Sequence, residues 1–371
     1  MRIVFVNSVR GWGGGLTSAV EVGSGLAEMG HEVTLVCHPS SVVARQLASE
    51  SSVKIAPIAI RAELNPYRVL QLIRLYRRVA PDVVLADRRK DVKLSVAARR
   101  LSGAFPIIHR HGAPSPLRNS AIYRHVWGRE VQALVVNSKT MRQRMLAEAP
   151  WLERAPLHII HNGKDTSRYK PLPRLRERIR RELGIPEDAF IVSFHGMVQP
   201  RKNVELLVKA VASLPADLKI HALVVGAGPT LPQLRALVAE IRAPVIFAGI
   251  REDIPEVLSA ADAAAHLSTA EGLSNSVIES MACGLPLVVS DATSHAEQVE
   301  DGKQGILVPP DDWRAVADAI RWLATDPAGR ERMGAAARKR ATEEFSRKRM
   351  LDRYDEVLRE TVAEYRATQG A

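Results

Sequence analysis

Short apolar runs separated by stretches of helical spacing dominate the first half of the chain. The apolar runs occupy residues 3–6, 33–37, 53–60, 83–86, 107–109 and 134–137. Between them, residues 16–29 and 65–79 repeat their apolar positions with the period of an α-helix. Buried runs that alternate with helices are typical of a parallel sheet covered by helices on both faces. We therefore expect an α/β domain of the Rossmann-like, doubly wound kind over residues 1–164.

The same pattern starts again near residue 190. Apolar runs cover 191–195, 220–225, 245–249, 263–267 and 287–290, and helical spacing falls near 203–213, 230–241, 254–260, 275–282, 295–299 and 312–324. This repeat predicts a second Rossmann-like domain over residues 165–345. The string Asn162-Gly163-Lys164-Asp165 and the prolines that follow it predict a hinge. We expect the last helix, residues 346–371, to pack back on the first domain, and ligands to bind in a central cleft between the domains.

Length and composition narrow the class of protein. The 371 residues contain no apolar run of the roughly 18 residues that span a bilayer, and the first strand lacks the apolar stretch of a signal peptide. The two cysteines, Cys37 and Cys283, lie in separate apolar stretches, so neither a disulfide framework nor a zinc site is expected. These features predict a cytoplasmic protein.

Charge is distributed unevenly along the chain. Residues 1–165 carry 24 Lys/Arg against 12 Asp/Glu, a net charge of +12, whereas residues 182–371 carry 21 against 28, a net charge of −7. A basic first half suits an acidic partner such as phospholipid, a phosphorylated glycan or nucleic acid, with simple solubility as the alternative. Aromatic residues make up only 5% of the chain and its five tryptophans are scattered, which disfavours nucleic acid.

One segment could carry the basic charge to a membrane. In Asn65–Val79, an apolar stripe formed by Val69, Leu72, Ile73, Tyr76 and Val79 faces away from Arg74 and Arg78. The stripe has two interpretations, because it could also pack on the sheet, which is the commoner fate of such a helix. In either case Arg74 and Arg78 remain available to contact anionic lipid, and we expect the first domain to bind the anionic inner leaflet of a membrane.

The strongest chemical signal is a string with two acids, Glu271 and Glu279, separated by seven residues. The string follows an apolar run, and Ser274 or Asn275 could cap the helix that begins there. The free backbone N–H groups from Gly272 to Asn275 and the helix dipole then predict an anion site, here for a diphosphate. An ionised Glu279 could accept hydrogen bonds from a ribose diol, and Glu271 would lie where a sugar binds.

This string resembles the E-x7-E motif of the family 4 retaining glycosyltransferases, which have the GT-B fold. Other segments resemble that family's loops over most of the chain. They are Gly13–Gly15 with Gly30–Val33, His111-Gly112, Asn162–Asp165, His195–Val204, Val224–Pro229 and Phe247–Pro255. The resemblance implies transfer of a sugar from a UDP-, GDP- or ADP-sugar, with retention and without metal or other cofactor. The expected acceptor is a glycan or lipid-linked molecule, as in cell-surface polysaccharide, lipopolysaccharide or glycolipid synthesis.

The resemblance also assigns roles to residues. A family Lys and Arg neutralise the diphosphate leaving group. Lys202 aligns with the Lys, whereas the Arg position holds Met197, with Arg201 as the nearest substitute. The catalytic candidates are therefore Lys202, Glu271, His111 and Arg201. The donor-binding candidates are Gly14, Gly15, Gly196, Gly228, Ile250, Arg251, Gly272, Leu273, Ser274, Asn275 and Glu279.

The first domain contributes fewer candidates. His109 and His111 alternate along one strand end, so their side chains share a side. His111 could contact the donor sugar or the acceptor, and a hydrogen-bonded structural histidine is the alternative. Asp87 and Arg88 follow another strand and could line the same cleft.

Three other functions fit the sequence less well. The glycine cluster after the first strand lacks the third glycine of a dinucleotide fingerprint, and the second strand ends Cys37-His38-Pro39 without an acid for a ribose. A phosphorylase would need a lysine that binds pyridoxal phosphate, and no motif in the sequence identifies one. An epimerase would convert the nucleotide sugar without an acceptor, so incubation with the donor alone would distinguish it from a glycosyltransferase. We therefore favour a glycosyltransferase with no metal, no nucleic-acid partner and a nucleotide-sugar donor.

Overall fold

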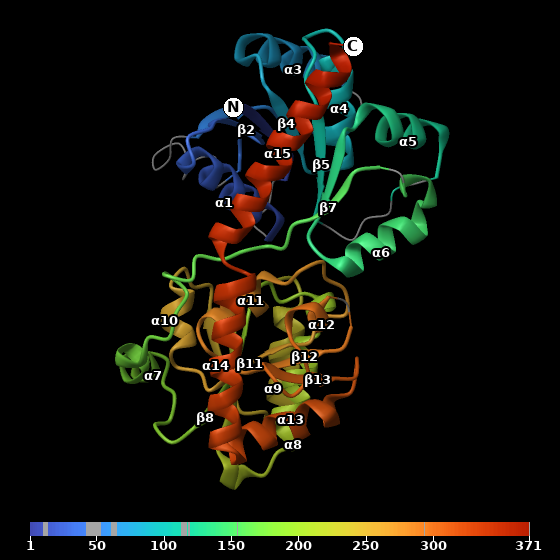
Figure 1. Ribbon diagram of the computed structural model, residues 1–371. Helices are drawn as coiled ribbons and strands as arrows, with labels where there is room; N and C mark the ends of the chain where they lie inside the picture. The colour runs from blue at the N-terminus through green and yellow to red at the C-terminus, as the bar shows by residue number, and fades with distance from the viewer. Residues whose placement is uncertain are drawn as a thin grey trace. The chain divides into compact units, whose positions relative to one another are not determined.

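The computed structural model describes residues 1–9, 14–41, 53–60, 65–112, 117, 119–153, 155–292 and 294–370. The chain divides into two compact units, which are coloured along the sequence in Figure 1. The first unit contains Met1–His161 together with the chain from Met350 onward, and the second contains Asn162–Arg349. The boundaries expected from the sequence are 164/165 and 345/346.

The first unit is built on a seven-stranded sheet in the order β3-β2-β1-β4-β5-β6-β7, and every strand pairing is parallel. Its strands are β1 Arg2–Val6, β2 Glu32–Cys37, β3 Lys54–Pro57, β4 Val83–Ala86, β5 Ile107–His111, β6 Ala133–Val136 and β7 Leu157–Ile159. The strand order reverses beside β1, so the crevice between the carboxyl ends of β1 and β4 is the switch point of the sheet.

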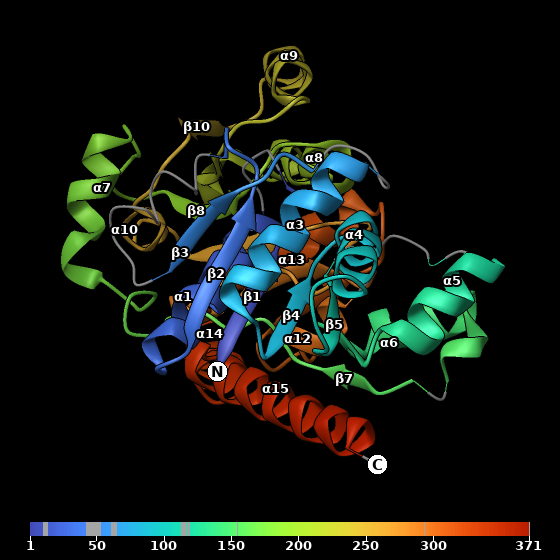
Figure 2. The same ribbon diagram turned by 90° about the horizontal axis from the view of Figure 1, so that it is seen from above.

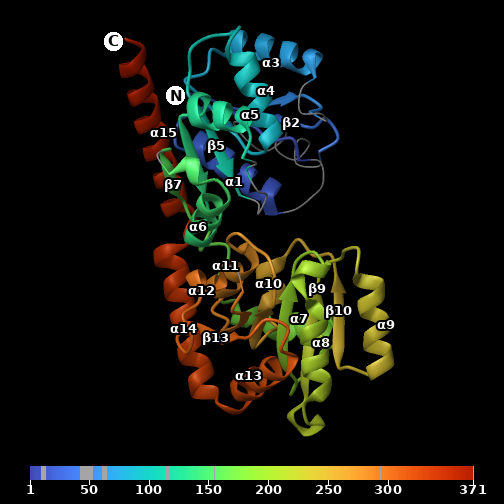
Figure 3. The ribbon, with the colours of Figure 1, turned by 90° about the vertical axis from the view of Figure 1, so that its right-hand side faces the viewer.

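Helices cover both faces of this sheet. They are α1 Gly14–Glu28, α3 Pro66–Val79, α4 Arg89–Arg99, α5 Ala121–His125, α6 Lys139–Glu148 and α15 Arg347–Gln369, with a π-helical turn at Val126–Glu130 and a 3-10 turn at Pro150–Leu152. Val4 and Val6 point into the core formed with α3 and α4, whereas Ile3 and Phe5 point into the core formed with α1 and α15. Figures 2 and 3 show α15 on the side of the sheet away from α3 and α4.

The contact between α15 and α1 is close. A Cβ atom built on Gly25 of α1 would lie 2.3 Å from Cδ1 of Leu351, so only glycine allows this approach. The buried side chains of α15 complete the same core: Met350, Leu351, Tyr354, Val357, Leu358 and Val362. The C-terminal helix is therefore an integral layer of the first unit.

The second unit repeats the design with a six-stranded parallel sheet in the order β10-β9-β8-β11-β12-β13. Its strands are β8 Phe190–His195, β9 Ile220–Val225, β10 Val245–Gly249, β11 Ala263–His266, β12 Leu287–Ser290 and β13 Gly305–Val308. The switch point lies between β8 and β11. The predicted fold class, two doubly wound parallel sheets, is confirmed.

The helices of the second unit are α7 Arg176–Glu182, α8 Val204–Ser213, α9 Leu231–Ile241, α10 Ile254–Leu258, α11 Asn275–Ala282, α12 His295–Gln298, α13 Trp313–Thr325 and α14 Pro327–Glu344. Three-residue 3-10 turns lie at Pro173–Leu175, Pro200–Lys202 and Ala216–Leu218. Side chains from α8 and α13 form the core on one face of the sheet, and side chains from α10, α11 and α14 form it on the other.

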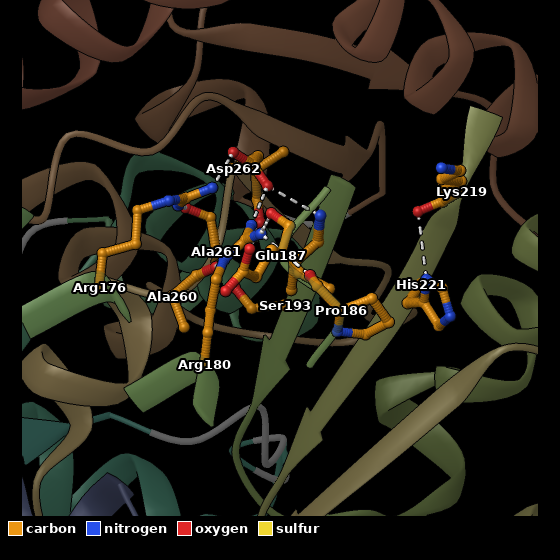
Figure 4. Close-up of polar contacts among 12 residues, drawn as sticks. Arg176, Arg180, Pro186, Glu187, Ser193, Lys219, His221, Ala260, Ala261 and Asp262 are labelled. Atoms are coloured by element: carbon orange, nitrogen blue, oxygen red, sulfur yellow. Dashed lines mark hydrogen bonds and ion pairs between the residues drawn. The ribbon is translucent and has the colours of Figure 1, made fainter. Parts of the chain in front are cut away.

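A buried charge cluster fixes the amino ends of β8 and β11 (Figure 4). The Asp262 carboxylate pairs with Arg176 at 2.7 Å and Arg180 at 2.9 Å and accepts the backbone N–H of Ile191 at 2.9 Å. Arg180 also donates to the backbone carbonyls of Ala260 and Glu187. This cluster ties α7 to the sheet at the edge opposite to the switch-point crevice.

The sequence reading missed several elements. It did not predict β7, β13, α4, α5, α6, α7 or α14. The apolar stripe of Pro66–Val79 packs in the core through Leu72, Ile73 and Tyr76, which settles its two interpretations in favour of packing on the sheet. Among the described residues, no helix is both long and apolar enough to cross a bilayer.

Candidate active site at the carboxyl edge of the second sheet

The switch point of the second unit gathers most of the predicted residues. β8 ends at His195 and Gly196 follows it, while β11 ends at His266 and leads into the loop that carries Glu271. Helix α11 begins four residues after Glu271 and contains Glu279. The two acids of the motif are therefore placed at the crevice where ligands of doubly wound sheets bind.

Glu271 is paired with two cations. Its Oε1 lies 2.5 Å from Nζ of Lys202 and 2.6 Å from Nη1 of Arg201. Burial would raise the pKa of Glu271, but Lys202 and Arg201 outweigh it and the pKa is lowered. Lys202 is buried, whereas the Arg201 side chain is 44% exposed. The carboxylate therefore carries its charge at neutral pH and serves as the counter-ion of both cations.

Glu279 lies deeper and is also paired on both oxygens. Its Oε1 is 3.0 Å from Nζ of Lys164, and its Oε2 is 3.0 Å from Nε2 of His195. Burial alone would raise the pKa of this carboxyl group, but Lys164 and His195 lower it to about 2. An ionised carboxylate offers about four lone-pair sites, so two partners leave it able to accept further hydrogen bonds.

The start of α11 differs from the predicted cap. Ser274 occupies the N-cap position, but its side chain makes no capping hydrogen bond, and Oγ of Ser274 and Oδ1 of Asn275 are buried without a partner. Gln298 of α12 holds the backbone of Ser274 instead, accepting from its N–H at 3.1 Å and donating to its carbonyl at 2.9 Å. Donors at the helix start thus remain for an anion, together with the positive end of the helix dipole.

Close backbone packing explains two of the predicted glycines. Gly196 has φ +138°, which favours glycine. A Cβ on Gly228 would lie 2.1 Å from the carbonyl oxygen of Val198, and one on Gly226 would lie 2.1 Å from that of Gly196. The loop after β9 therefore packs directly on the loop that leads to Lys202, and these glycines set the position of that lysine.

The predicted base-binding loop follows β10. Ile250 is 78% exposed. The guanidinium of Arg251 is engaged by Asp253 at 2.6 Å and Glu182 at 2.5 Å, and these carboxylates raise its pKa. Ile250 and Glu252 are the exposed residues of this loop.

Met197 is 40% exposed and offers no charge at the position where Arg is expected. The guanidinium of Arg201, four residues further along the chain, also donates to the carbonyl of Ala270 at 3.2 Å. The structure thus brings Arg201, Lys202 and Glu271 together, and Arg201 reaches the same carboxylate as Lys202.

In the first unit, His109 and His111 share a side of β5, with ring centroids 5.1 Å apart. His109 is fully buried and accepts a hydrogen bond from Nε1 of Trp127 at 2.8 Å, so His109 has a structural role. His111 is 4% exposed at the strand end. Asp87 is bound by Arg110 through two hydrogen bonds of 2.6 and 2.9 Å, which makes it part of a buried pair rather than an open cleft residue.

The remaining candidates are few. Gly14 and Gly15 are the first two residues of α1, and Gly13 lies outside the described residues. Within the described ranges, no group of three or more His, Cys, Asp or Glu side chains is arranged to hold a metal ion. Both cysteines are buried, which raises the pKa of Cys37 to about 11 and of Cys283 to about 12.

Sequence reasoning missed two residues of the site. Lys164 lies in the string that predicts a hinge, and no motif marks Gln298 as a functional residue. Each acts on a partner more than 20 residues away, which leaves no local pattern. The burial of a lysine beside a hinge glycine gives no signal in a single sequence.

Two family models match the chain. One, described as "Glycosyltransferase Family 4", matches residues 12–168, and the other, "Glycosyl transferases group 1", matches residues 176–340. The family 4 model covers most of residues 1–161 of the first unit. The group 1 model covers the part of the second unit that contains Lys202, Glu271 and Glu279.

Curated relatives and solved structures agree with these matches. The alpha-maltose-1-phosphate synthase of Mycolicibacterium smegmatis is 33% identical over 62% of this chain, which spans 64% of that protein's length. The lipopolysaccharide core biosynthesis glycosyltransferase LpsE of Rhizobium meliloti is 27% identical over 93% of this chain and 96% of its own. Anabaena HepE, solved in complex with UDP-glucose, is 21% identical with a TM-score of 0.85, covering 97% of this chain and 100% of HepE.

Proposed function

Because the chain belongs to the family 4 glycosyltransferases and has the GT-B fold, we propose that it transfers a sugar from a nucleoside diphosphate sugar to a glycan or lipid-linked acceptor, with retention of the donor's anomeric configuration. The observation that carries the proposal is the pair of acids around α11. Glu271 pairs with Lys202, and Glu279 is a buried acceptor that is ionised at neutral pH, because its pKa is lowered to about 2. Retention is inherited from the family resemblance.

Each part of the donor has a partner in this arrangement. The uncapped start of α11 and Lys202 bind the diphosphate, whose negative charge grows as the glycosidic bond breaks. Glu279 accepts hydrogen bonds from the ribose hydroxyls, and Glu271 lies beside the transferred sugar. Amides and a lysine replace the divalent cation that other transferases use, so no metal is required.

A binding screen followed by a product analysis tests this function. UDP, GDP and ADP and their hexose derivatives are compared by thermal shift, where a ligand at about 100 times its Kd stabilises by about 2.7 kcal/mol. The nucleotide sugar that binds is then incubated with and without glycan acceptors, and the product's anomeric configuration is read by NMR. We expect acceptor-dependent transfer with retention. Inversion would refute retention, and conversion of the donor alone would identify an epimerase instead.

We also propose that the first unit docks on an anionic membrane leaflet, where a lipid-linked acceptor would be found. The exposed face of α3 carries Tyr67, Leu70 and Arg74. Arg77 donates to the carbonyl of Leu101 at 2.8 Å, and Arg100 contacts His125 of α5 at 3.0 Å. These contacts link α3, the end of α4 and α5, and Tyr67, Leu70, Leu101 and Ile122 are exposed apolar side chains on these segments.

Flotation with anionic and neutral vesicles at low and high salt tests this docking. We expect binding to anionic vesicles at low salt only, since screening removes the attraction. Arg74→Glu should weaken it at least fivefold, because each basic residue near the leaflet contributes about 1 kcal/mol. Arg142→Glu on α6, which Figures 1 and 3 show at the other end of the unit, changes the net charge equally and should bind as the wild type. Equal effects of both variants, or no binding of the wild type to anionic vesicles, would refute the proposed membrane docking.

A further inference from the structure

Lys164 is among the most buried charged residues of the protein. It is 2% exposed, in the segment between β7 and α7. Its backbone N–H donates to the carbonyl of Phe345 at 2.9 Å, and its carbonyl accepts from the N–H of Arg347 at 2.8 Å. The lysine backbone is thus held in a parallel bridge with Ser346, and its side chain projects from a fixed point.

The ammonium group of Lys164 reaches Glu279. Nζ lies 3.0 Å from Oε1, and His195 holds the other oxygen at the same distance. Burying an ammonium without a partner costs several kcal/mol, so a lysine is retained in such a place only where a carboxylate compensates it. Two partners on opposite oxygens also fix the rotation of the carboxylate, which a single partner would leave free.

We propose that Lys164 is a positioning residue for the donor site: it orients Glu279 and keeps it anionic, so that the carboxylate can accept hydrogen bonds from the nucleotide's ribose. The inference rests on the proposed function, because Glu279 is the group through which Lys164 would act on the donor. Lys164 itself need not touch the ligand.

The electrostatic surroundings support this role. Burial raises the pKa of Glu279, Lys164 opposes it most strongly, and His195 adds to the effect. Of the other titratable groups nearby, burial lowers the pKa of His266, whose ring lies 5.1 Å from that of His195, and raises the pKa of the Cys283 thiol just after α11; Lys202 acts on His266 and Arg338 acts on Cys283. Without Lys164, burial would therefore drive Glu279 toward its neutral form.

The experiment uses the full-length protein in four forms: Lys164→Met, Lys164→Arg, Glu279→Gln and the double variant Lys164→Met/Glu279→Gln. Lys219→Met is the control, since Lys219 is an exposed lysine of the same unit that pairs with Asp188. UDP, GDP and ADP are titrated calorimetrically at pH 8 and pH 5.5, and urea unfolding is followed at both pH values.

For nucleotide binding we expect Lys164→Met to weaken affinity about tenfold at pH 8 and further at pH 5.5, as Glu279 takes up its proton. Lys164→Arg should remain within about threefold of the wild type because its charge is kept. The double variant should bind no more weakly than Glu279→Gln alone, since a lysine that acts through Glu279 has no effect once that charge is gone.

Stability gives the second readout, which does not depend on a ligand. In the wild type, the lowered pKa of Glu279 contributes stability that is present above its unfolded-state pKa and lost only as pH falls toward 2. In Lys164→Met the pKa is raised instead, so the penalty for the ionised carboxylate is present at pH 8 and fades as pH falls. The gap in urea midpoint between Lys164→Met and the double variant should therefore narrow from pH 8 to pH 5.5.

The outcomes separate the two proposals. If the wild type binds none of the three nucleotides, the proposed donor site fails and the positioning role fails with it, even where the stability gap reports the ion pair. If the wild type binds one and Lys164→Met binds it equally well at both pH values, or if the effects of Lys164→Met and Glu279→Gln add, the positioning role alone is overturned.

Discussion

The two edges of the second sheet both carry buried charges, but they use them differently. At the amino edge, Arg180 shares its donors between Asp262 and backbone carbonyls, and Asp262 also accepts a backbone N–H. At the carboxyl edge, Glu271 and Glu279 are paired with side chains of Lys202, Arg201, Lys164 and His195. The first network includes several main-chain groups, whereas the second is built mainly between side chains, with one backbone contact from Arg201 to the carbonyl of Ala270.

This difference is the one we expect between a structural network and the proposed donor site. A cation that is bonded to backbone carbonyls cannot leave them without disturbing the fold. A cation that is held by one carboxylate at the rim of a crevice can be shared with an incoming anion, because both partners keep a counter-charge. Substitutions at the amino edge should therefore lower the free energy of unfolding, and substitutions at the carboxyl edge should change nucleotide binding and turnover.

The largest effect is expected at the amino edge. Asp262→Ala leaves Arg180 and Arg176 without their carboxylate, and breaking a buried pair in this way costs about 3–5 kcal/mol of unfolding free energy. Urea unfolding measures it, with Asp318→Ala, an exposed partner of Arg321 on α13, as the control. Activity per folded molecule should stay unchanged. A stable variant that has lost nucleotide binding would break the comparison.

At the carboxyl edge, Lys202→Ala should lower turnover by about 10²- to 10³-fold, the usual effect of removing a group that stabilises developing negative charge. The affinity for whichever of UDP, GDP and ADP binds the wild type should fall less, and that for its nucleoside should not change, because Lys202 acts on the diphosphate. Steady-state kinetics and calorimetry distinguish these values. Lys209→Ala on α8 is the matched control, and equal losses in both variants would contradict the assignment.

Glu271→Gln sharpens the comparison with an effect of opposite sign. The ionised Glu271 competes with an incoming diphosphate for Lys202 and Arg201, so its removal should tighten binding of the nucleoside diphosphate severalfold, by roughly 1 kcal/mol. Turnover should nevertheless fall, since the group beside the sugar is lost. Calorimetry with whichever of UDP, GDP and ADP binds the wild type measures the first change. Weaker binding of that nucleotide in this variant would show that Glu271 is not the resident counter-ion.

The smallest effect concerns metal. If Lys202 and the amides of α11 neutralise the leaving group, treatment with EDTA should leave the rate within experimental error of the untreated enzyme. Adding Mg²⁺ back should change nothing. A rate that falls with EDTA and returns with Mg²⁺ would mean that Lys202 and the amides of α11 do not neutralise the leaving group without a metal ion.

The sequence predicts the local features well and the long-range pairs poorly. The two acids, the start of α11 and all strands except β7 and β13 follow from apolar runs and short motifs. The predicted side-chain cap by Ser274 or Asn275 is not formed, and Gln298, which lies 24 residues away, holds the backbone of Ser274 instead. Likewise, Lys164 and Glu279 are 115 positions apart, and no periodicity connects them.

Helix α14 was missed for a different reason. Its buried positions include Gly329, Gly334, Ala337 and Ala341, so the face that packs is marked by small residues instead of large apolar ones. A Cβ on Gly334 would lie 2.4 Å from the carbonyl oxygen of Gly284. A helix that packs through backbone contact therefore lacks the apolar stripe by which helices are recognised in a sequence.

The place of α15 in the first unit has a consequence for synthesis on the ribosome. The second unit is one continuous stretch of chain, and all of its strands are available once α14 has emerged. The first unit begins earlier but lacks one wall of its core until Val357, Leu358 and Val362 are translated. Domains usually mature in the order of their N-termini. Here the sheet of the first unit must wait for a helix that is made after the second unit, because α15 packs on α1 where Leu351 approaches Gly25.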